Sequence, residues 1–248
     1  MPLFSSLSSC SLSKRLYSAV ELLVGGIFLL ALGKALPPLM ASPANWSVAW
    51  GLYGLIALLV LTFWSHGVLG WANRITLARA VLVTLMAGAL VANAFLDAIW
   101  QWLAIAIIAL LLDGVDGWIA RRTQSHSRFG ARFDMELDAL LILLLCVGLW
   151  RLESLGPWVV LIGGMRYLFV AASWQFSWLS APLYASFRRK AVCVWQVVAL
   201  LLALTPLTSH LMASLLAISA LLSLIYSFGM DSWWLYKQFQ REPDKRLD

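Results

Sequence analysis

The feature that most constrains this chain is a close succession of apolar segments, each long enough to cross a bilayer as a helix. A helix needs roughly 20 apolar residues to span the hydrocarbon core. The sequence predicts eight such spans, at residues 17–36, 47–65, 78–96, 98–117, 136–152, 156–174, 190–207 and 210–230. These segments are too long for the strands of a membrane barrel. We therefore expect an all-α, polytopic membrane helical bundle.

Composition and charge agree with a membrane environment. The 248 residues are 62% hydrophobic and only 12% charged, whereas ordinary soluble domains carry roughly 25% charged residues. The net charge of +6 does not predict a nucleic-acid partner, because membrane proteins retain Lys and Arg on the side that faces anionic lipid. The three cysteines are scattered, without a Cys-x-x-Cys pair, and predict neither a disulfide framework nor a zinc site.

The distribution of basic residues predicts the orientation. With eight spans and both termini in the cytoplasm, 15 of the 18 Lys and Arg residues lie on the cytoplasmic side. Lys34 and Arg151 fall on the opposite side, and Arg166 lies within a span. The first span is longer than the apolar part of a signal peptide, so we expect it to be retained.

Four aspartates stand out near the cytoplasmic edge of the predicted bundle. At 100° per residue, Asp113 and Asp116 share one helical face, and Asp134 and Asp138 share a face of the next helix. A turn at residues 122–129 would fold these two helices into a hairpin. The four carboxylates are then expected to converge on one spot.

Such a group of carboxylates requires cations. Charged side chains at the membrane edge are costly unless they are paired or functional. Oxygen ligands suit hard ions, so we predict Mg²⁺ or Mn²⁺, with two divalent ions balancing the four charges. Solvated Asp–Arg pairs in a loop would explain the neighbouring arginines but not the matched helical faces.

The same region resembles a known family signature. Eight positions match, one by one, the signature of the CDP-alcohol phosphotransferase family: Asp113, Asp116, Gly117, Ala120, Arg121, Gly130, Asp134 and Asp138. The resemblance covers residues 71–230 and implies a six-helix family core. Residues 1–70 would then be two extra N-terminal transmembrane helices, and residues 231–248 a polar cytoplasmic tail.

A second segment looks like the family's approach to its first core helix. Asn73, Thr76 and Arg79 follow one another at a spacing of three residues, although Ala72 stands where a proline is usual. This spacing puts the three polar groups on one helical side, which we expect near the aspartate hairpin. The pattern alone would also fit a helix cap followed by a snorkelling arginine. Beside the main signature, we expect these residues to belong to the nucleotide site.

The resemblance implies an enzyme of phospholipid biosynthesis. The reaction moves a phosphatidyl or other phosphoalcohol group from a CDP-alcohol lipid, such as CDP-diacylglycerol, to a small polar acceptor alcohol and releases CMP. The expected location is the cytoplasmic face of a bacterial inner membrane, with membrane lipid around the bundle. The resemblance also allows a homodimer.

The resemblance also implies residue roles. Three aspartates (Asp113, Asp116 and Asp134) would be metal ligands, and Asp138 a fourth ligand and the catalytic base. The expected CDP-alcohol-binding residues are Asn73, Thr76, Arg79, Gly117, Ala120, Arg121 and Gly130.

Basic residues further along the chain suggest the acceptor. Arg166, Arg188 and Lys190, together with Arg189, favour a phosphate-bearing molecule, because guanidinium groups make bidentate phosphate contacts. Glycerol 3-phosphate is the first choice, as in phosphatidylglycerophosphate synthases, although Tyr167 stands where that branch often has a glutamate. Inositol or its phosphate, serine and choline remain alternatives. Snorkelling and generic cytoplasmic charge would also explain these basic residues.

Two rival interpretations have different functions. A divalent-cation transporter also places acids in a membrane, although its site tends to lie near the midplane. A scaffold without activity is disfavoured because every signature position is intact. The first two spans are expected to serve assembly, and Glu21 within them has no assigned mechanism.

Overall fold

The computed structural model describes residues 3–64, 69–123, 128–180 and 186–241, in which every regular element is a helix and none is a strand. Within these ranges the chain forms eight long helices, one at each predicted span. Two compact units divide the chain, Met1–Leu141 and Ile142–Asp248, and each is described by itself. The all-α bundle predicted from the sequence is confirmed.

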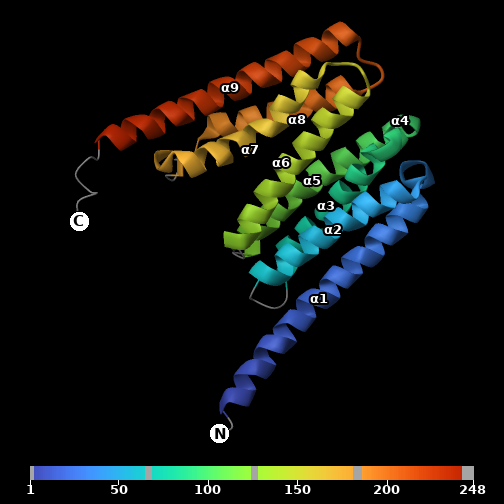
Figure 1. The fold of residues 1–248 in the computed structure, drawn as a ribbon, viewed down its shortest axis with the longest axis vertical. Coiled ribbons are helices and arrows are strands. Elements are labelled where there is room, and N and C mark those ends of the chain that lie inside the picture. Colours follow the sequence, from blue (N-terminus) through green and yellow to red (C-terminus); the bar gives the residue numbers. More distant parts are fainter. Residues whose placement is uncertain (1–2, 65–68, 124–127, 181–185, 242–248) are drawn as a thin grey trace. The chain divides into compact units, whose positions relative to one another are not determined.

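The first unit contains α1 (Leu3–Ala35), α2 (Pro43–Phe63), α3 (Gly70–Leu90), the short α4 (Ala94–Asp97), α5 (Ile99–Thr123) and the start of α6 (Arg128–Arg151). Its centre is α3, which packs on both α2 and α5 and also contacts α1 (Figure 1). Every residue from Arg79 to Leu90 is buried. The core of this unit therefore surrounds α3.

The predicted span 78–96 differs from the helix that forms there. The helix starts earlier, at Gly70, because the polar residues of its first turns are accommodated by neighbouring helices. It ends at Leu90, and Ala92 and Asn93 adopt left-handed backbone angles, with φ of 53° and 57°. These two residues break the helix and redirect the chain through α4 into α5, where the Trp102 indole donates to the Met86 carbonyl at 3.1 Å.

The second unit contains the rest of α6, then α7 (Val160–Gln175), α8 (Phe187–Leu204) and α9 (His210–Arg241). Packing of α8 on α9 is its main helix contact. On the α6 side, Gly163 of α7 lies against the backbone of Leu143, where an added Cβ would be 2.6 Å from the Leu143 Cα. A glycine at this position allows the two helices to approach closely.

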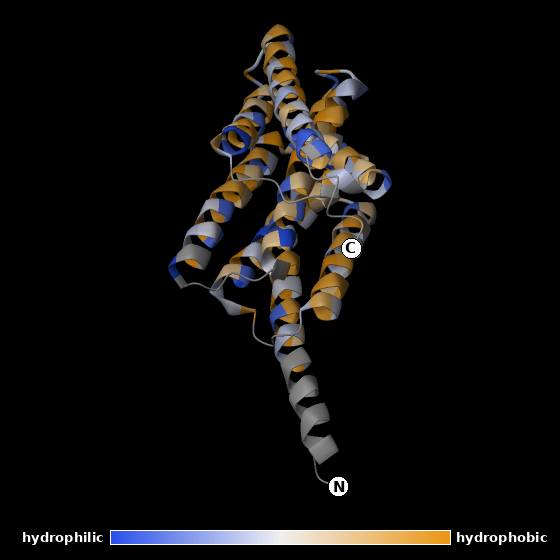
Figure 2. Cartoon of the chain, turned by 90° about the vertical axis from the view of Figure 1, so that its left-hand side faces the viewer, coloured by the Kyte–Doolittle hydropathy of each residue, from blue (hydrophilic) through white to orange (hydrophobic). Residues whose placement is uncertain are grey.

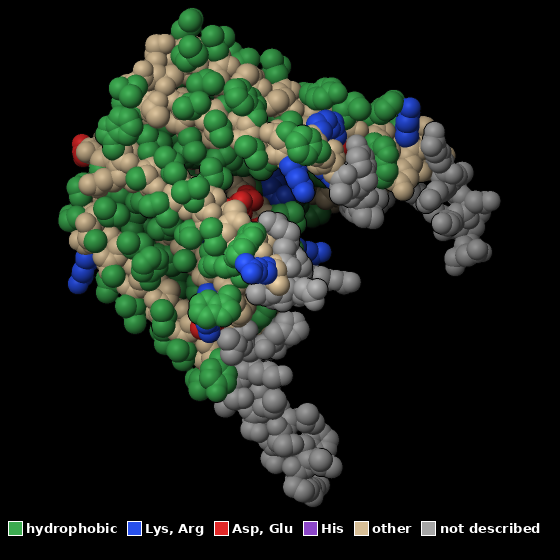
Figure 3. Space-filling view, turned by 180° about the vertical axis from the view of Figure 1, so that it is seen from behind, with side chains coloured by type: hydrophobic (Ala, Val, Ile, Leu, Met, Phe, Trp, Pro, Cys, Tyr) green, Lys and Arg blue, Asp and Glu red, His purple; other side chains and the backbone are tan. Residues whose placement is uncertain are grey.

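Six segments are long and apolar enough to cross a membrane, at 16–35, 43–63, 70–97, 99–119, 157–175 and 210–240 among the described residues. Hydrophobic residues run along most of their length (Figure 2), and hydrophobic side chains cover much of the face seen in Figure 3. Helices α6 and α8 are not among the six, because each begins with several charged residues. Spanning by these two helices, and the cytoplasmic placement of the termini, stay predictions.

Candidate metal centre

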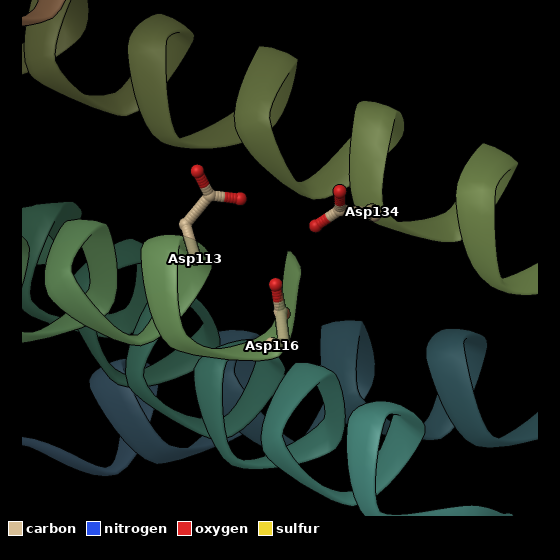
Figure 4. Close-up of side chains that lie close together, drawn as sticks. All are labelled: Asp113, Asp116 and Asp134. Atoms are coloured by element: carbon tan, nitrogen blue, oxygen red, sulfur yellow. The ribbon is translucent and has the colours of Figure 1, made fainter. Parts of the chain in front are cut away.

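Helices α5 and α6 bring the four predicted aspartates together. Asp113 and Asp116 are one turn apart on α5, and Asp134 and Asp138 are one turn apart on α6. Figure 4 shows the carboxylates of Asp113, Asp116 and Asp134 directed into the space between the two helices. The convergence predicted from helical periodicity is observed.

The four carboxylates differ in how far they are exposed. The Asp116 side chain is buried, whereas those of Asp113, Asp134 and Asp138 are 31%, 34% and 35% exposed. The cluster is thus closed on the side of Asp116 and open on the side of the other three. An ion or substrate could reach the three open carboxylates without displacing the helices.

A third helix, α3, supplies the cation of this cluster. The Arg79 side chain is 1% exposed, and its Nη1 contacts Asp113 at 2.9 Å, Asp116 at 3.1 Å and also Asp134. Its Nη2 donates to Asp138 at 2.5 Å, and its Nε donates to the Ala109 carbonyl at 3.1 Å. One guanidinium therefore contacts all four carboxylates.

The other two polar residues of the same segment have different partners. The Thr76 hydroxyl is buried within 3.1 Å of both the Asp116 carboxylate and the Ala72 carbonyl. The Asn73 amide instead donates to the Leu69 carbonyl at 2.7 Å, within the first turn of α3. Thr76 and Arg79 thus lie at the cluster, while Asn73 is held by its own helix. Nucleotide binding by the three remains a prediction.

The charge and spacing of the cluster fit a hard cation. Four ionised carboxylates and one guanidinium leave three negative charges uncompensated. One oxygen each from Asp113, Asp116 and Asp134 lie within 4.8 Å of one another. Oxygen ligands about 2.1 Å from an octahedral ion are roughly 3 to 4.2 Å apart, so small side-chain movements would bring the three onto one ion. The Arg79 Nη1 already lies among these same three carboxylates, which shows that the position suits a positive charge.

The remaining predicted donor-binding residues lie on the same two helices. Gly117 and Gly130 are half-buried on α5 and α6. Ala120 and Arg121 belong to α5, but their side chains lie outside the described part of the structure. The contribution of these four residues to the donor site stays a prediction.

The predicted acceptor residues belong to the second unit. Arg188 lies at the start of α8 and pairs with Asp231 of α9 at 2.5 Å, while Arg189 is 3.8 Å from the same carboxylate. Asp231 is 4% exposed. Lys190 is exposed and Arg166 of α7 is half-buried. Sequence reasoning missed Asp231, although a lone acidic residue in the long apolar stretch of α9 was a signal for a buried ion pair.

Arg79 was expected at the nucleotide site near the aspartate hairpin, and only its contact with all four aspartates was not predicted. A buried arginine in the membrane needs an acidic partner. Applied to Arg79, that rule points to the four aspartates as the nearest surplus of negative charge.

Comparison with known proteins agrees with the site geometry. The family model described as CDP-alcohol phosphatidyltransferase matches residues 69–226, which is more than half of the chain and contains all four aspartates and Arg79. Neither a curated protein nor a solved structure matches the chain. The matched segment begins at α3, so α1 and α2 precede it.

Proposed function

Because the chain belongs to the CDP-alcohol phosphatidyltransferase family, we propose that it transfers a phosphatidyl group from CDP-diacylglycerol, or a related CDP-alcohol, to an acceptor alcohol. The observation that carries this proposal is the convergence of four aspartates from α5 and α6 around the buried Arg79. With divalent ions bound, such a cluster would provide a charged site for a diphosphate inside an otherwise apolar bundle.

The reaction is a substitution at phosphorus. The acceptor hydroxyl oxygen forms a bond to the phosphorus that carries the lipid, and the bond from that phosphorus to the bridging oxygen breaks. CMP leaves with the bridging oxygen and its electron pair, and the hydroxyl proton passes to a base. Asp138 is the proposed base, because it is a partly exposed carboxylate at the open side of the cluster.

The other three aspartates have a different proposed role. Asp113, Asp116 and Asp134 would hold Mg²⁺ or Mn²⁺, and Asp138 would be a further ligand. The bound ions would offset the charge that develops on the departing CMP and orient the diphosphate. With two divalent ions and Arg79, the cluster changes from three negative charges to one positive charge, which favours an anionic donor.

Donor binding is proposed for the residues that border the cluster. Thr76 fixes Asp116 by its hydroxyl, and Arg79 carries a planar guanidinium suited to phosphate oxygens. Gly117 and Ala120 would leave room for the nucleotide against α5, and Gly130 would let α6 approach closely. Arg121 would contact the phosphates or the cytidine. Asn73 would act through the first turn of α3.

The proposed acceptor is glycerol 3-phosphate. Support comes from the basic residues Arg166, Arg188, Arg189 and Lys190 of the second unit. Asp231 pairs with Arg188 and lies 3.8 Å from Arg189, so basic groups outnumber this acidic group. The proposed site faces the cytoplasm of a bacterial inner membrane, where water-soluble acceptors are available.

The test is transfer by the purified, reconstituted protein. Radiolabelled CDP-diacylglycerol is offered with Mg²⁺ or Mn²⁺ and a panel of glycerol 3-phosphate, inositol, inositol phosphate, serine and choline. We expect a labelled phosphatidyl product with glycerol 3-phosphate. A product with serine, choline or inositol instead would overturn the acceptor and keep the transferase. No product with any acceptor, together with Mn²⁺ flux into protein-containing vesicles, would favour a cation transporter.

A further inference from the structure

The first turn of α3 is held by a side chain from α1. The Glu21 carboxylate accepts a hydrogen bond from the Leu69 backbone N–H at 2.9 Å and pairs with Arg74 at 2.6 Å. The side chain of Leu69, the N-cap residue of α3, forms no capping hydrogen bond. Helix N-termini carry unpaired N–H groups and favour a nearby negative charge. Glu21 therefore caps the start of α3 from another helix.

The last turn of α3 is held by a side chain from α2. The Asn45 amide nitrogen donates to the Gly88 carbonyl at 2.9 Å and to the Val91 carbonyl at 2.8 Å. Asn45 is fully buried. The final carbonyls of a helix in general lack partners within the helix, and the Gly88 carbonyl accepts from the Val91 N–H as well as from the Asn45 amide. Both hydrogens of one amide thus donate to carbonyls at the end of α3.

The backbones of α2 and α3 meet at the same point. A Cβ added to Gly88 would lie 2.7 Å from the Asn45 carbonyl oxygen, so only glycine allows this approach. The Tyr53 hydroxyl of α2 donates to the Leu22 carbonyl of α1 at 2.5 Å, beside Glu21. The two capping helices are therefore tied to each other as well as to α3.

Arg79 lies midway between the two capped ends. It follows Leu69 by ten residues and precedes Gly88 by nine, or about 15 Å and 13.5 Å of helix. A shift or fraying of α3 at either end would move Thr76 and Arg79 relative to the four aspartates, which belong to α5 and α6.

We propose that the two N-terminal helices cap α3 at both ends and so position Arg79 at the carboxylates, with Glu21 and Asn45 as positioning residues. This inference rests on the proposed function and gives the N-terminal extension a role at the site itself. Both helices lie before the segment that the family model matches.

The test measures Mn²⁺ binding to the full-length protein in detergent by electron paramagnetic resonance. Arg79 repels a cation bound by the same carboxylates, so Arg79→Gln should bind Mn²⁺ more tightly. Glu21→Met and Asn45→Ala should tighten Mn²⁺ binding in the same direction, by about 3- to 10-fold, because each loosens the position of Arg79. A general loss of stability would not strengthen binding.

Two matched controls isolate the capping contacts. Ser42→Ala removes the α2 capping partner of Asn45 but leaves the Asn45 contacts to α3. Arg74→Met removes the ion pair of Glu21 but leaves its bond to the Leu69 N–H. Both controls should bind Mn²⁺ within about 2-fold of wild type, because each leaves the capping hydrogen bonds to α3 in place.

A double-mutant comparison completes the experiment. In the Arg79→Gln background, Asn45→Ala should have no further effect on Mn²⁺ affinity, because its effect acts through Arg79. If Asn45→Ala does not fold, Glu21→Met is compared with and without Arg79→Gln in the same way. The capping role would be overturned if Glu21→Met and Asn45→Ala both bound Mn²⁺ with wild-type affinity. It would also be overturned if Asn45→Ala changed the Mn²⁺ affinity as much in the Arg79→Gln background as in wild type. Absence of Mn²⁺ binding in wild type would instead overturn the proposed metal centre.

Discussion

The two units of this protein contain charged clusters of opposite sign. In the first unit, four aspartates surround one arginine, and the surplus is negative. In the second unit, Arg188 and Arg189 share one buried aspartate, Asp231, and the surplus is positive. Under the proposed function, the first cluster would bind cations and the second an anion, which are the two kinds of partner that the reaction needs.

The largest effect is expected for the metal ligands. Asp113→Asn, Asp116→Asn or Asp134→Asn should each lower transfer about 10³-fold or more, because metal ions stabilise such transition states by several kcal/mol. Mn²⁺ binding should weaken in each variant. Glu136→Gln is the matched control, since Glu136 is an exposed acid on α6, the helix of Asp134. Near-normal turnover in any of the three variants would refute the shared site.

The next effect separates Asp138 from the other aspartates. Asp138→Asn should lower transfer about 100-fold through loss of the base, while binding of CDP-diacylglycerol stays closer to wild type than in Asp116→Asn. Equilibrium binding of labelled donor to the purified variants checks this. An equal loss of donor binding in both variants would remove the base assignment and leave Asp138 as a fourth ligand.

A smaller effect tests the balance of charge in the first cluster. Arg79→Gln should lower transfer about 10- to 100-fold, because the proposed contribution of its guanidinium to donor binding is lost. The same variant should bind Mn²⁺ about tenfold more tightly, since about 1.4 kcal/mol of charge repulsion is removed. Opposite shifts of activity and affinity are the signature to look for. Weaker Mn²⁺ binding would mean that Arg79 mainly organises the carboxylates.

The smallest effect concerns the second cluster. Arg188→Gln should raise the KM for glycerol 3-phosphate about tenfold, the value of one charge-assisted phosphate contact, without changing the donor KM. It also leaves the buried Asp231 with only the longer contact to Arg189, at a cost of about 1–3 kcal/mol in stability.

A paired variant separates these two consequences. Arg188→Gln combined with Asp231→Asn removes the unpaired charge, so thermal unfolding should return toward that of wild type while the acceptor KM stays high. If the KM for glycerol 3-phosphate returned to the wild-type value together with thermal stability, Arg188 would serve only the ion pair with Asp231.

Local periodicity was sufficient to predict the aspartate hairpin. Residues three or four apart on a helix share a face regardless of the rest of the fold, so Asp113 with Asp116 and Asp134 with Asp138 could be placed from the sequence. In the structure, the two pairs lie together around Arg79. The helix count followed from hydropathy in the same way.

Contacts between distant segments were not predictable in this way. Arg79 reaches the aspartates because α3 packs on α5, and Glu21 and Asn45 reach α3 because α1 and α2 pack on it. The break at Ala92 was also missed, because alanine normally favours a helix and its left-handed conformation depends on the surrounding packing.

The most direct test of the central claim is CMP release by the reconstituted protein. CDP-diacylglycerol is mixed with Mn²⁺ and glycerol 3-phosphate, and CMP and phosphatidyl product are measured together in wild type, Asp116→Asn and the Glu136→Gln control. The account predicts equal amounts of CMP and product, abolished by removing Mn²⁺ or by Asp116→Asn and retained in the control. CMP release at the wild-type rate in Asp116→Asn, or without any divalent ion, would contradict it.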